Sequence, residues 1–269
     1  MTQARWFPPL LCAALALALC FLTLPIVAIF VDTGPGDLLA SLDDPAAVDA
    51  LSLSLWTSAL AVAIIVAVGT PAAYLLATRE FRGRSLLVTL IELPLVLPPA
   101  VAGIGLLAAL GPNGLFGRAL QGAGVQIVLT TASVVLALTF VAAPFYVRHA
   151  ESAFGALDRS WLDASRTLGA GEATTFARVA IPAALPGLVA GLALAWGRAL
   201  GEFGATLMFA GSFRGVTQTV PLAIYERFAT DFTAALGLSA VLVAVSAAIL
   251  LTVKLATRAV PGGRGLAAR

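Results

Sequence analysis

The chain has 269 residues, of which 60% are hydrophobic and 11% are charged, and its mean hydropathy is +0.99. A soluble domain carries roughly 25% charged residues, so lipid must cover much of the surface of this protein. The net charge of +2 and the scattered basic residues give no footprint for a nucleic acid. The only histidine is His149, and Cys12 and Cys20 have neither the spacing of a metal site nor that of a disulfide framework. We therefore expect an integral membrane protein with no metal site.

Six long apolar segments predict six membrane-spanning helices. A spanning helix needs about 20 mostly apolar residues. Hydrocarbon offers no partner to free backbone N–H and C=O groups, and barrel strands would need an alternation of polar and apolar residues that these segments lack. The predicted fold class is all-α and polytopic, with a single transmembrane domain over residues 1–269. The expected spans are, approximately, residues 10–31, 50–78, 85–110, 125–147, 182–209 and 232–253.

Two of these spans allow a second interpretation. Arg5 before the uncharged stretch Trp6–Val31 is also typical of a secretory signal peptide. We favour a retained helix, because the apolar core is too long and an acidic loop follows it. In the third span, Pro94, Pro98 and Pro99 interrupt the backbone hydrogen-bond ladder. Such breaks occur both in pore linings and in kinked lipid-facing helices.

The charges between the spans predict the orientation in the membrane. Assigning the loops alternately to the two sides places 12 cationic residues on one side and three on the other, with Arg198 inside a span. Cytoplasmic loops carry the excess of Lys and Arg, so we expect both termini in the cytoplasm. The 12 are Arg5, Arg79, Arg82, Arg84, Arg148, Arg159, Arg166, Arg178, Lys254, Arg258, Arg264 and Arg269, and the three are Arg118, Arg214 and Arg227.

One cytoplasmic connection, from Arg148 to Ile181, is about 34 residues long, and loops of that length are usually functional or disordered. Asp158 is suited to cap the start of a helix, and Gly169 can supply the left-handed residue that ends one. We therefore predict a short amphipathic helix at the membrane surface. Its expected faces carry Trp161, Ala164, Ser165 and Leu168 on one side, and Asp163 and Arg166 on the other.

This connection, residues 148–182, resembles the conserved cytoplasmic loop of ABC importer permeases. The family pattern is Glu-Ala-Ala, three residues, Gly, nine residues and Ile-x-Leu-Pro, and Asp163–Ser165, Gly169 and Val179–Pro182 stand at the same spacing. The replacements keep charge sign, size or apolarity. The resemblance implies a coupling helix that docks into a groove of an ATPase subunit. The residues it assigns to coupling are Trp161, Asp163, Ala164, Ser165 and Gly169, with Trp161 either anchoring the loop at the membrane interface or filling the groove.

Four further segments, Leu93–Pro99, Gly197–Thr206, Phe209–Ser212 and Gln218–Tyr225, are similar to the molybdate subgroup of the molybdate/sulfate permease family. The likeness extends from the second span to the sixth. It implies the type I importer fold, a homodimer around one pathway, and the role of membrane-spanning subunit of an ATP-driven molybdate importer in a bacterial cytoplasmic membrane. The implied partners are an ATPase subunit, which binds ATP and Mg²⁺, an extracytoplasmic binding protein and membrane lipid. Tungstate, sulfate and thiosulfate are the alternative cargoes.

The sequence argues against an enzyme. It has no Gly-x-x-x-x-Gly-Lys-Ser/Thr phosphate loop, and its only lysine, Lys254, closes the last span. The chain is therefore expected to bind no cofactor and to depend on a partner for ATP hydrolysis. A proton-coupled secondary transporter is the competing class. Its marks would be two related halves and paired carboxylates at mid-depth, and Glu92 and Glu202 show no evident partner set.

Arg198, Glu202 and Thr206 are the candidate pathway or gate residues. Arg198 and Glu202 stand four residues apart inside a predicted span, where an unpaired charge is costly. We favour a mutual ion pair that fixes helix packing, and contact of Arg198 with the anion is the alternative. The pairs Gly187/Gly191 and Gly197/Gly201 predict close helix packing.

Overall fold

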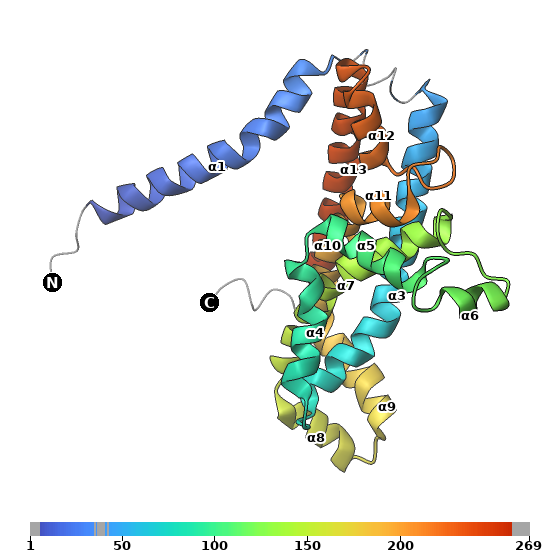
Figure 1. The fold of residues 1–269 in the computed structure, drawn as a ribbon. Coiled ribbons are helices and arrows are strands. Elements are labelled where there is room, and N and C mark those ends of the chain that lie inside the picture. The colour runs from blue at the N-terminus through green and yellow to red at the C-terminus, as the bar shows by residue number, and fades with distance from the viewer. Residues whose placement is uncertain (1–5, 35, 37–40, 42, 260–269) are drawn as a thin grey trace.

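The computed structural model describes residues 6–34, 36, 41 and 43–259, and this described part is helical and contains no strand (Figure 1). The predicted all-α fold class is confirmed. The predictions that rest on Arg5, Arg264 and Arg269 lie outside the described residues. The elements are α1 (Phe7–Asp32), α3 (Pro45–Thr78), α4 (Arg84–Val96), α5 (Pro99–Leu110), α6 (Gly117–Gly122), α7 (Thr131–Gly155), α8 (Arg159–Thr167), α9 (Glu172–Thr175), the π-helical segment η1 (Phe176–Ala180), α10 (Ile181–Leu200), α11 (Gly204–Ala210), α12 (Val220–Phe228) and α13 (Phe232–Ala259).

Within the described residues, five helical segments are long and apolar enough to cross a membrane: α1, α3, α7, the continuous stretch Glu172–Leu200, and α13. The third predicted span is divided into α4 and α5, which are bent by 116°. Leu97 and Pro98 each precede a proline and adopt extended ψ angles of 131° and 134°, because a following proline disfavours the helical region. With this bent pair counted as one span, the six predicted spans are confirmed.

The fourth span is displaced from its predicted range of 125–147. α7 begins at Thr131, because Leu129 has a φ of +62° and Thr130 is extended. The helix continues to Gly155 and carries Arg148 and Glu151 on its last turns. Because both residues are charged, the sequence predicts that the span ends before them, whereas ion pairs with α4 allow them to remain on the helix.

The prediction of a single helix over residues 182–209 is wrong. α10 ends at Leu200 and α11 begins at Gly204, so Glu202 lies in the break and not on the helix that carries Arg198. The side chain of Glu202 accepts a hydrogen bond from the backbone N–H of Ala205 at 2.7 Å. A carboxylate bound to a nearby backbone N–H competes with the helical hydrogen-bond ladder, which accounts for the break.

The main hydrophobic core lies between α3, α7 and α10. A methyl group added at Gly187 would lie 2.5 Å from Cβ of Ala153, and one added at Gly191 would lie 2.8 Å from Cβ of His149. These distances are too short for a real contact, so the close packing predicted for this glycine pair is confirmed for α10 against α7. No atom of the described chain lies within 4 Å of such a methyl at Gly197, and the second predicted pair makes no comparable contact.

α4 contains no buried residue, and it is attached to the body both by Val88 and Ile91, which pack against the main core, and by charged groups that contact α7. Arg148 pairs with Glu92 at 2.7 Å and with Glu151 at 2.6 Å, and Glu151 also pairs with Arg84 at 2.8 Å. Glu92 therefore has a partner that the sequence did not reveal. An apolar pocket of about 350 Å³ lies between Ile91 and Pro94 of α4 and the facing residues of α3 and α7, so the ion pairs supplement an apolar contact that is incompletely filled.

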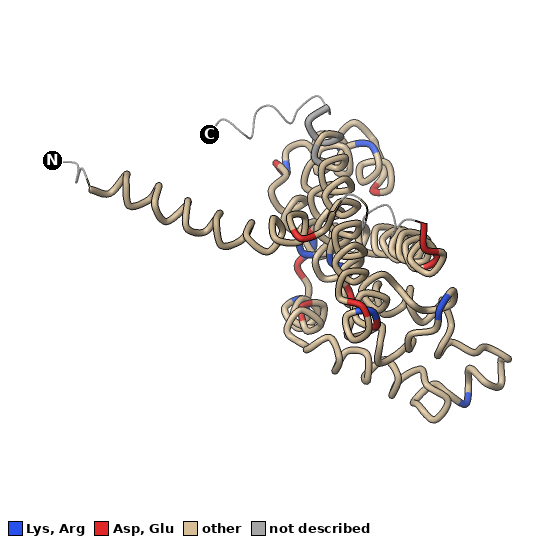
Figure 2. Tube along the Cα trace, turned by 90° about the horizontal axis from the view of Figure 1, so that it is seen from above, with Lys and Arg blue, Asp and Glu red and all other residues tan. Residues whose placement is uncertain are grey.

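α1 leaves the body of the molecule and has no buried residue (Figures 1 and 2). Figure 2 shows it extending outward without charged residues along most of its length. α8 and α9 lie together at the end of the body opposite to α12 and the start of α3 (Figure 1). The connection predicted to be cytoplasmic is therefore at one extreme of the molecule.

Candidate coupling surface and translocation pathway

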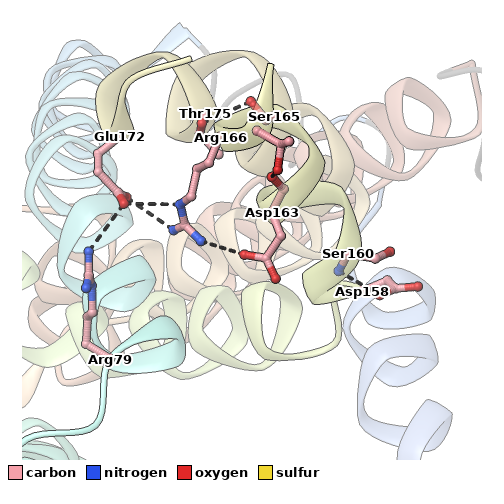
Figure 3. Close-up of polar contacts among 9 residues, drawn as sticks. Arg79, Asp158, Ser160, Asp163, Ser165, Arg166, Glu172 and Thr175 are labelled. Atoms are coloured by element: carbon pink, nitrogen blue, oxygen red, sulfur yellow. Dashed lines mark hydrogen bonds and ion pairs between the residues drawn. The ribbon is translucent and has the colours of Figure 1, made fainter. Parts of the chain in front are cut away.

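α8 forms where the sequence predicts a short helix after Asp158. The Asp158 side chain accepts a hydrogen bond from the backbone N–H of Ser160 at 2.9 Å (Figure 3). This bond satisfies one of the free donors of the first turn, and it holds the pKa of the Asp158 carboxyl below its ordinary value. The predicted cap is confirmed.

The other end of α8 is closed by a Schellman motif around Gly169. The backbone N–H of Gly169 donates to the carbonyl of Arg166 at 2.9 Å, and that of Ala170 donates to the carbonyl of Ser165 at 3.1 Å. Gly169 has a φ of +86°, and a methyl group built on it would have no further atom of the described residues within 4 Å. The requirement for glycine is therefore conformational and not one of space.

The face of α8 that points away from the body is apolar. Trp161 is 55% exposed and Leu168 is 88% exposed, and Ala164 between them is exposed as well. The side that faces the body is instead formed by Leu162, which is buried in the main core, and by Ser165, whose hydroxyl lies 3.0 Å from that of Thr175. The sequence did not indicate Leu162 as the anchor, and the prediction that Ser165 shares a face with Trp161 and Leu168 is wrong.

A chain of charged residues connects α8 to α9 and to the end of α3 (Figure 3). Arg166 contacts Asp163 at 3.0 Å and makes a two-bond contact with Glu172, Nε to Oε1 at 3.1 Å and Nη2 to Oε2 at 3.2 Å. Nη2 of Arg79 lies 3.4 Å from the same Oε1. Two-bond guanidinium–carboxylate contacts fix orientation as well as distance, and the contact with Glu172 raises the pKa of Arg166. Asp163 is thus paired within the chain.

The predicted pathway residues lie at the break between α10 and α11. Nη2 of Arg198 lies 2.6 Å from Oε2 of Glu202, whose side chain is only 1% exposed. The predicted ion pair is confirmed, although Glu202 sits beyond the end of α10. Thr206 is fully buried, and its hydroxyl has no hydrogen-bond partner among the described residues.

The two broken spans meet next to this ion pair. A methyl group added at Gly204 would lie 2.9 Å from Cβ of Pro99, and one added at Gly103 would lie 2.6 Å from the carbonyl oxygen of Ala205. α5 and α11 are therefore in near backbone contact. The prolines of the third span and Glu202 of the fifth, which the sequence presents as separate features, belong to one region of the fold.

Residues 69–261 match the family described as "Binding-protein-dependent transport system inner membrane component". The chain belongs to this family. It is 46% identical over 233 residues to the "Molybdenum transport system permease protein ModB" of Mycobacterium tuberculosis, covering 87% of this chain and 88% of that protein. It is also 35% identical over 182 residues to the "Sulfate transport system permease protein CysT" of Salmonella typhimurium, covering 67% of this chain and 66% of that protein. The resemblance to the molybdate/sulfate permeases is confirmed.

A solved structure with the same fold comes from a bacterial ABC transporter involved in the import of the acidic polysaccharide alginate. Its TM-score is 0.74 at 15% sequence identity, over 95% of this chain and 96% of that chain. A methionine ABC transporter in an inward-facing conformation gives a TM-score of 0.62 over 79% of this chain and 95% of that chain. The permease fold implied by the sequence resemblance is confirmed.

Proposed function

We propose that this chain is the membrane-spanning subunit of an ATP-driven importer that carries molybdate across a bacterial cytoplasmic membrane. The observation that carries the proposal is the 46% identity, over 87% of this chain, to a permease of a molybdenum transport system. The likeness to a sulfate permease is lower and covers 67% of this chain. Molybdate and sulfate are both tetrahedral dianions, so the choice of cargo has to be tested directly.

The deciding experiment measures uptake into cells that express this chain with its ATPase and binding protein. Radiolabelled molybdate should accumulate, and unlabelled molybdate should compete better than the same concentration of sulfate. Better competition by sulfate would reassign the cargo, and uptake without ATP hydrolysis, driven by a proton gradient, would favour the secondary-transporter class.

The proposed docking site for the ATPase is the outward face of α8. Trp161, Ala164 and Leu168 expose an apolar surface at the extreme end of the molecule, and Asp163 lies at its edge, 69% exposed. ATP and Mg²⁺ would be bound by the ATPase alone. Trp161→Ser should reduce the amount of ATPase that copurifies with the permease, whereas Asp163→Asn should have a smaller effect because Arg166 already pairs with Asp163.

The proposed assembly contains two copies of this chain. α1 is 26 residues long and strongly apolar, yet none of its residues is buried within its own chain. A second copy, besides lipid, would give this helix a surface to pack on. Dimerisation would also bring together two copies of Arg198, Glu202 and Thr206, which we propose line or gate the pathway. Mass measurement of the purified permease should give twice the chain mass of 27.4 kDa.

We propose that both termini and α8 lie in the cytoplasm. The loops assigned to that side carry most of the Lys and Arg residues, and cytoplasmic loops carry this excess. Reporter fusions after Asp44 and after Arg84 should report opposite sides of the membrane. Finding both fusions on one side would contradict the arrangement of six spans.

A further inference from the structure

We infer that Arg79 and Glu172 are positioning residues that set the angle of α8 against the membrane-spanning helices, through Arg166. This inference rests on the proposed function of α8 as the ATPase contact. Arg79 lies outside the sequence pattern that marks the coupling loop, and Glu172 is one of the nine positions of that pattern at which no residue type is specified. Their place in the coupling machinery comes only from the geometry in Figure 3.

α8 has few other contacts that could fix its orientation. It has nine residues, and Leu162 is the only one of them that is buried. A single buried side chain acts as a pivot, because it fixes one point of a helix and leaves rotation about that point free. The Ser165–Thr175 contact, at 3.0 Å, lies on the same side as the pivot. The Arg166–Glu172 contact lies on the other flank and removes the remaining freedom.

Glu172 connects the orientation of α8 to two membrane-spanning helices. It is the first residue of α9 and of the continuous helical stretch Glu172–Leu200, which carries Arg198 near its other end. A carboxylate in the first turn of a helix is also favoured by the helix dipole. Oε1 of Glu172 also contacts Arg79, which is the C-terminal cap residue of α3. The side chain of Glu172 therefore links α8, α3 and the continuous helical stretch Glu172–Leu200.

The ion pairs among Arg166, Glu172 and Arg79 are weak enough to break and form again in each transport cycle. The side chains of Arg166, Glu172 and Arg79 are 36%, 55% and 59% exposed, so water screens their attraction. Exposed pairs of this kind change an equilibrium by about two- to five-fold. That is enough to bias the orientation of α8 and too little to lock it. The expected consequence of breaking the chain is loose coupling and not loss of folding.

The transport test uses the complete complex of permease, ATPase and binding protein in proteoliposomes, and measures ATP hydrolysed per molybdate imported. Glu172→Gln should raise this ratio about two- to five-fold, and Arg79→Gln should raise it less, because its contact is single and 3.4 Å long. The double variant should resemble Glu172→Gln alone. A product of the two single effects would mean that Arg79 acts independently of Glu172 and would overturn the inference. Arg178→Gln, at an exposed arginine with no ion pair among the described residues, is the matched control and should leave the ratio unchanged.

A distance measurement decides the inference even if the complex imports no molybdate, in which case the proposed function fails separately. Spin labels are placed on Ser160 of α8 and Arg82 after α3, both exposed, in a chain with Cys12 and Cys20 changed to Ser. Labelled chain is diluted with unlabelled chain so that distances within one copy dominate. The distance distribution should broaden in Glu172→Gln and remain narrow in Arg178→Gln. Equal distributions in the parent and Glu172→Gln would show that α8 is positioned by other contacts.

Discussion

Glu202 holds Arg198 at 2.6 Å with one carboxylate oxygen and binds the backbone N–H of Ala205 at 2.7 Å with the other. The same side chain thus neutralises a cation of α10 and caps the first turn of α11. Both functions place it in the break between the two helices, where it is 1% exposed. The ion pair and the break in the span have one cause.

The first prediction concerns this pair. Arg198→Gln leaves a buried, unpaired carboxylate and should cost about 3 kcal/mol, the low end for buried pairs because Arg198 is 27% exposed. Glu202→Gln should cost less, since the amide oxygen can still accept the N–H of Ala205. The double variant should recover part of the loss caused by Arg198→Gln. Membrane level and radiolabelled molybdate uptake are measured for all three. If uptake does not recover in the double variant, Arg198 contacts the anion and the structural interpretation is wrong.

The second prediction concerns the turn that ends α8. Gly169→Val should uncouple ATP hydrolysis from uptake while leaving membrane insertion intact, because the left-handed conformation costs a side chain roughly 1–2 kcal/mol and a β-branched one more. Gly169→Asn should retain most of the uptake, since asparagine tolerates this conformation. Similar losses in both variants would point to contact with a partner at this position in place of backbone conformation.

The third prediction tests the contact between the two broken spans. Gly103→Ala should lower the thermal stability of the purified permease in detergent, because the added methyl would lie 2.6 Å from the carbonyl oxygen of Ala205 and 2.8 Å from Cβ of Met208. Overpacking of this kind costs about 1–3 kcal/mol. Gly105→Ala is the control on the same helix, because no neighbouring atom in the described part of the chain lies within 4 Å of its added methyl. Equal melting temperatures for the two variants would contradict the close approach of α5 and α11.

The fourth prediction separates the two carboxylates that attach α4 to α7. Glu151 is 8% exposed and pairs with both Arg84 and Arg148. Glu151→Gln removes the carboxylate partner of Arg84 and one of the two carboxylate partners of Arg148, so it should clearly lower stability. Among the residues that the structure describes, Glu92 pairs only with Arg148, and its side chain is 38% exposed, so Glu92→Gln should change stability by less than about 1 kcal/mol. Thermal unfolding in detergent compares the variants. A larger loss in Glu92→Gln would show that the ion pair with Glu92 is the main attachment.

The sequence by itself determined which segments are long and apolar enough to cross the membrane and where α8 begins and ends. Long apolar runs leave helices as the only structure that satisfies the backbone in lipid. Asp158 and Gly169 mark the ends of α8, because a side-chain cap and a left-handed residue depend on neighbours close in sequence. The family resemblance rests on the same local pattern and on apolar segments whose order along the chain is fixed.

Tertiary structure decided everything that depends on which side of a helix meets another helix. The outward apolar face of α8 follows from the burial of Leu162 in a core made by other helices. Arg79 and Glu172 are 93 positions apart in the sequence and form an ion pair. Glu92 and Arg148, which lie on different helices, also form one. The close contact of α5 with α11 at Gly103 and Gly204, next to the break at Glu202, joins two spans that are far apart in the sequence. Hydrophobic periodicity carries no information about such pairings, because it records how apolar each face is and not what that face contacts.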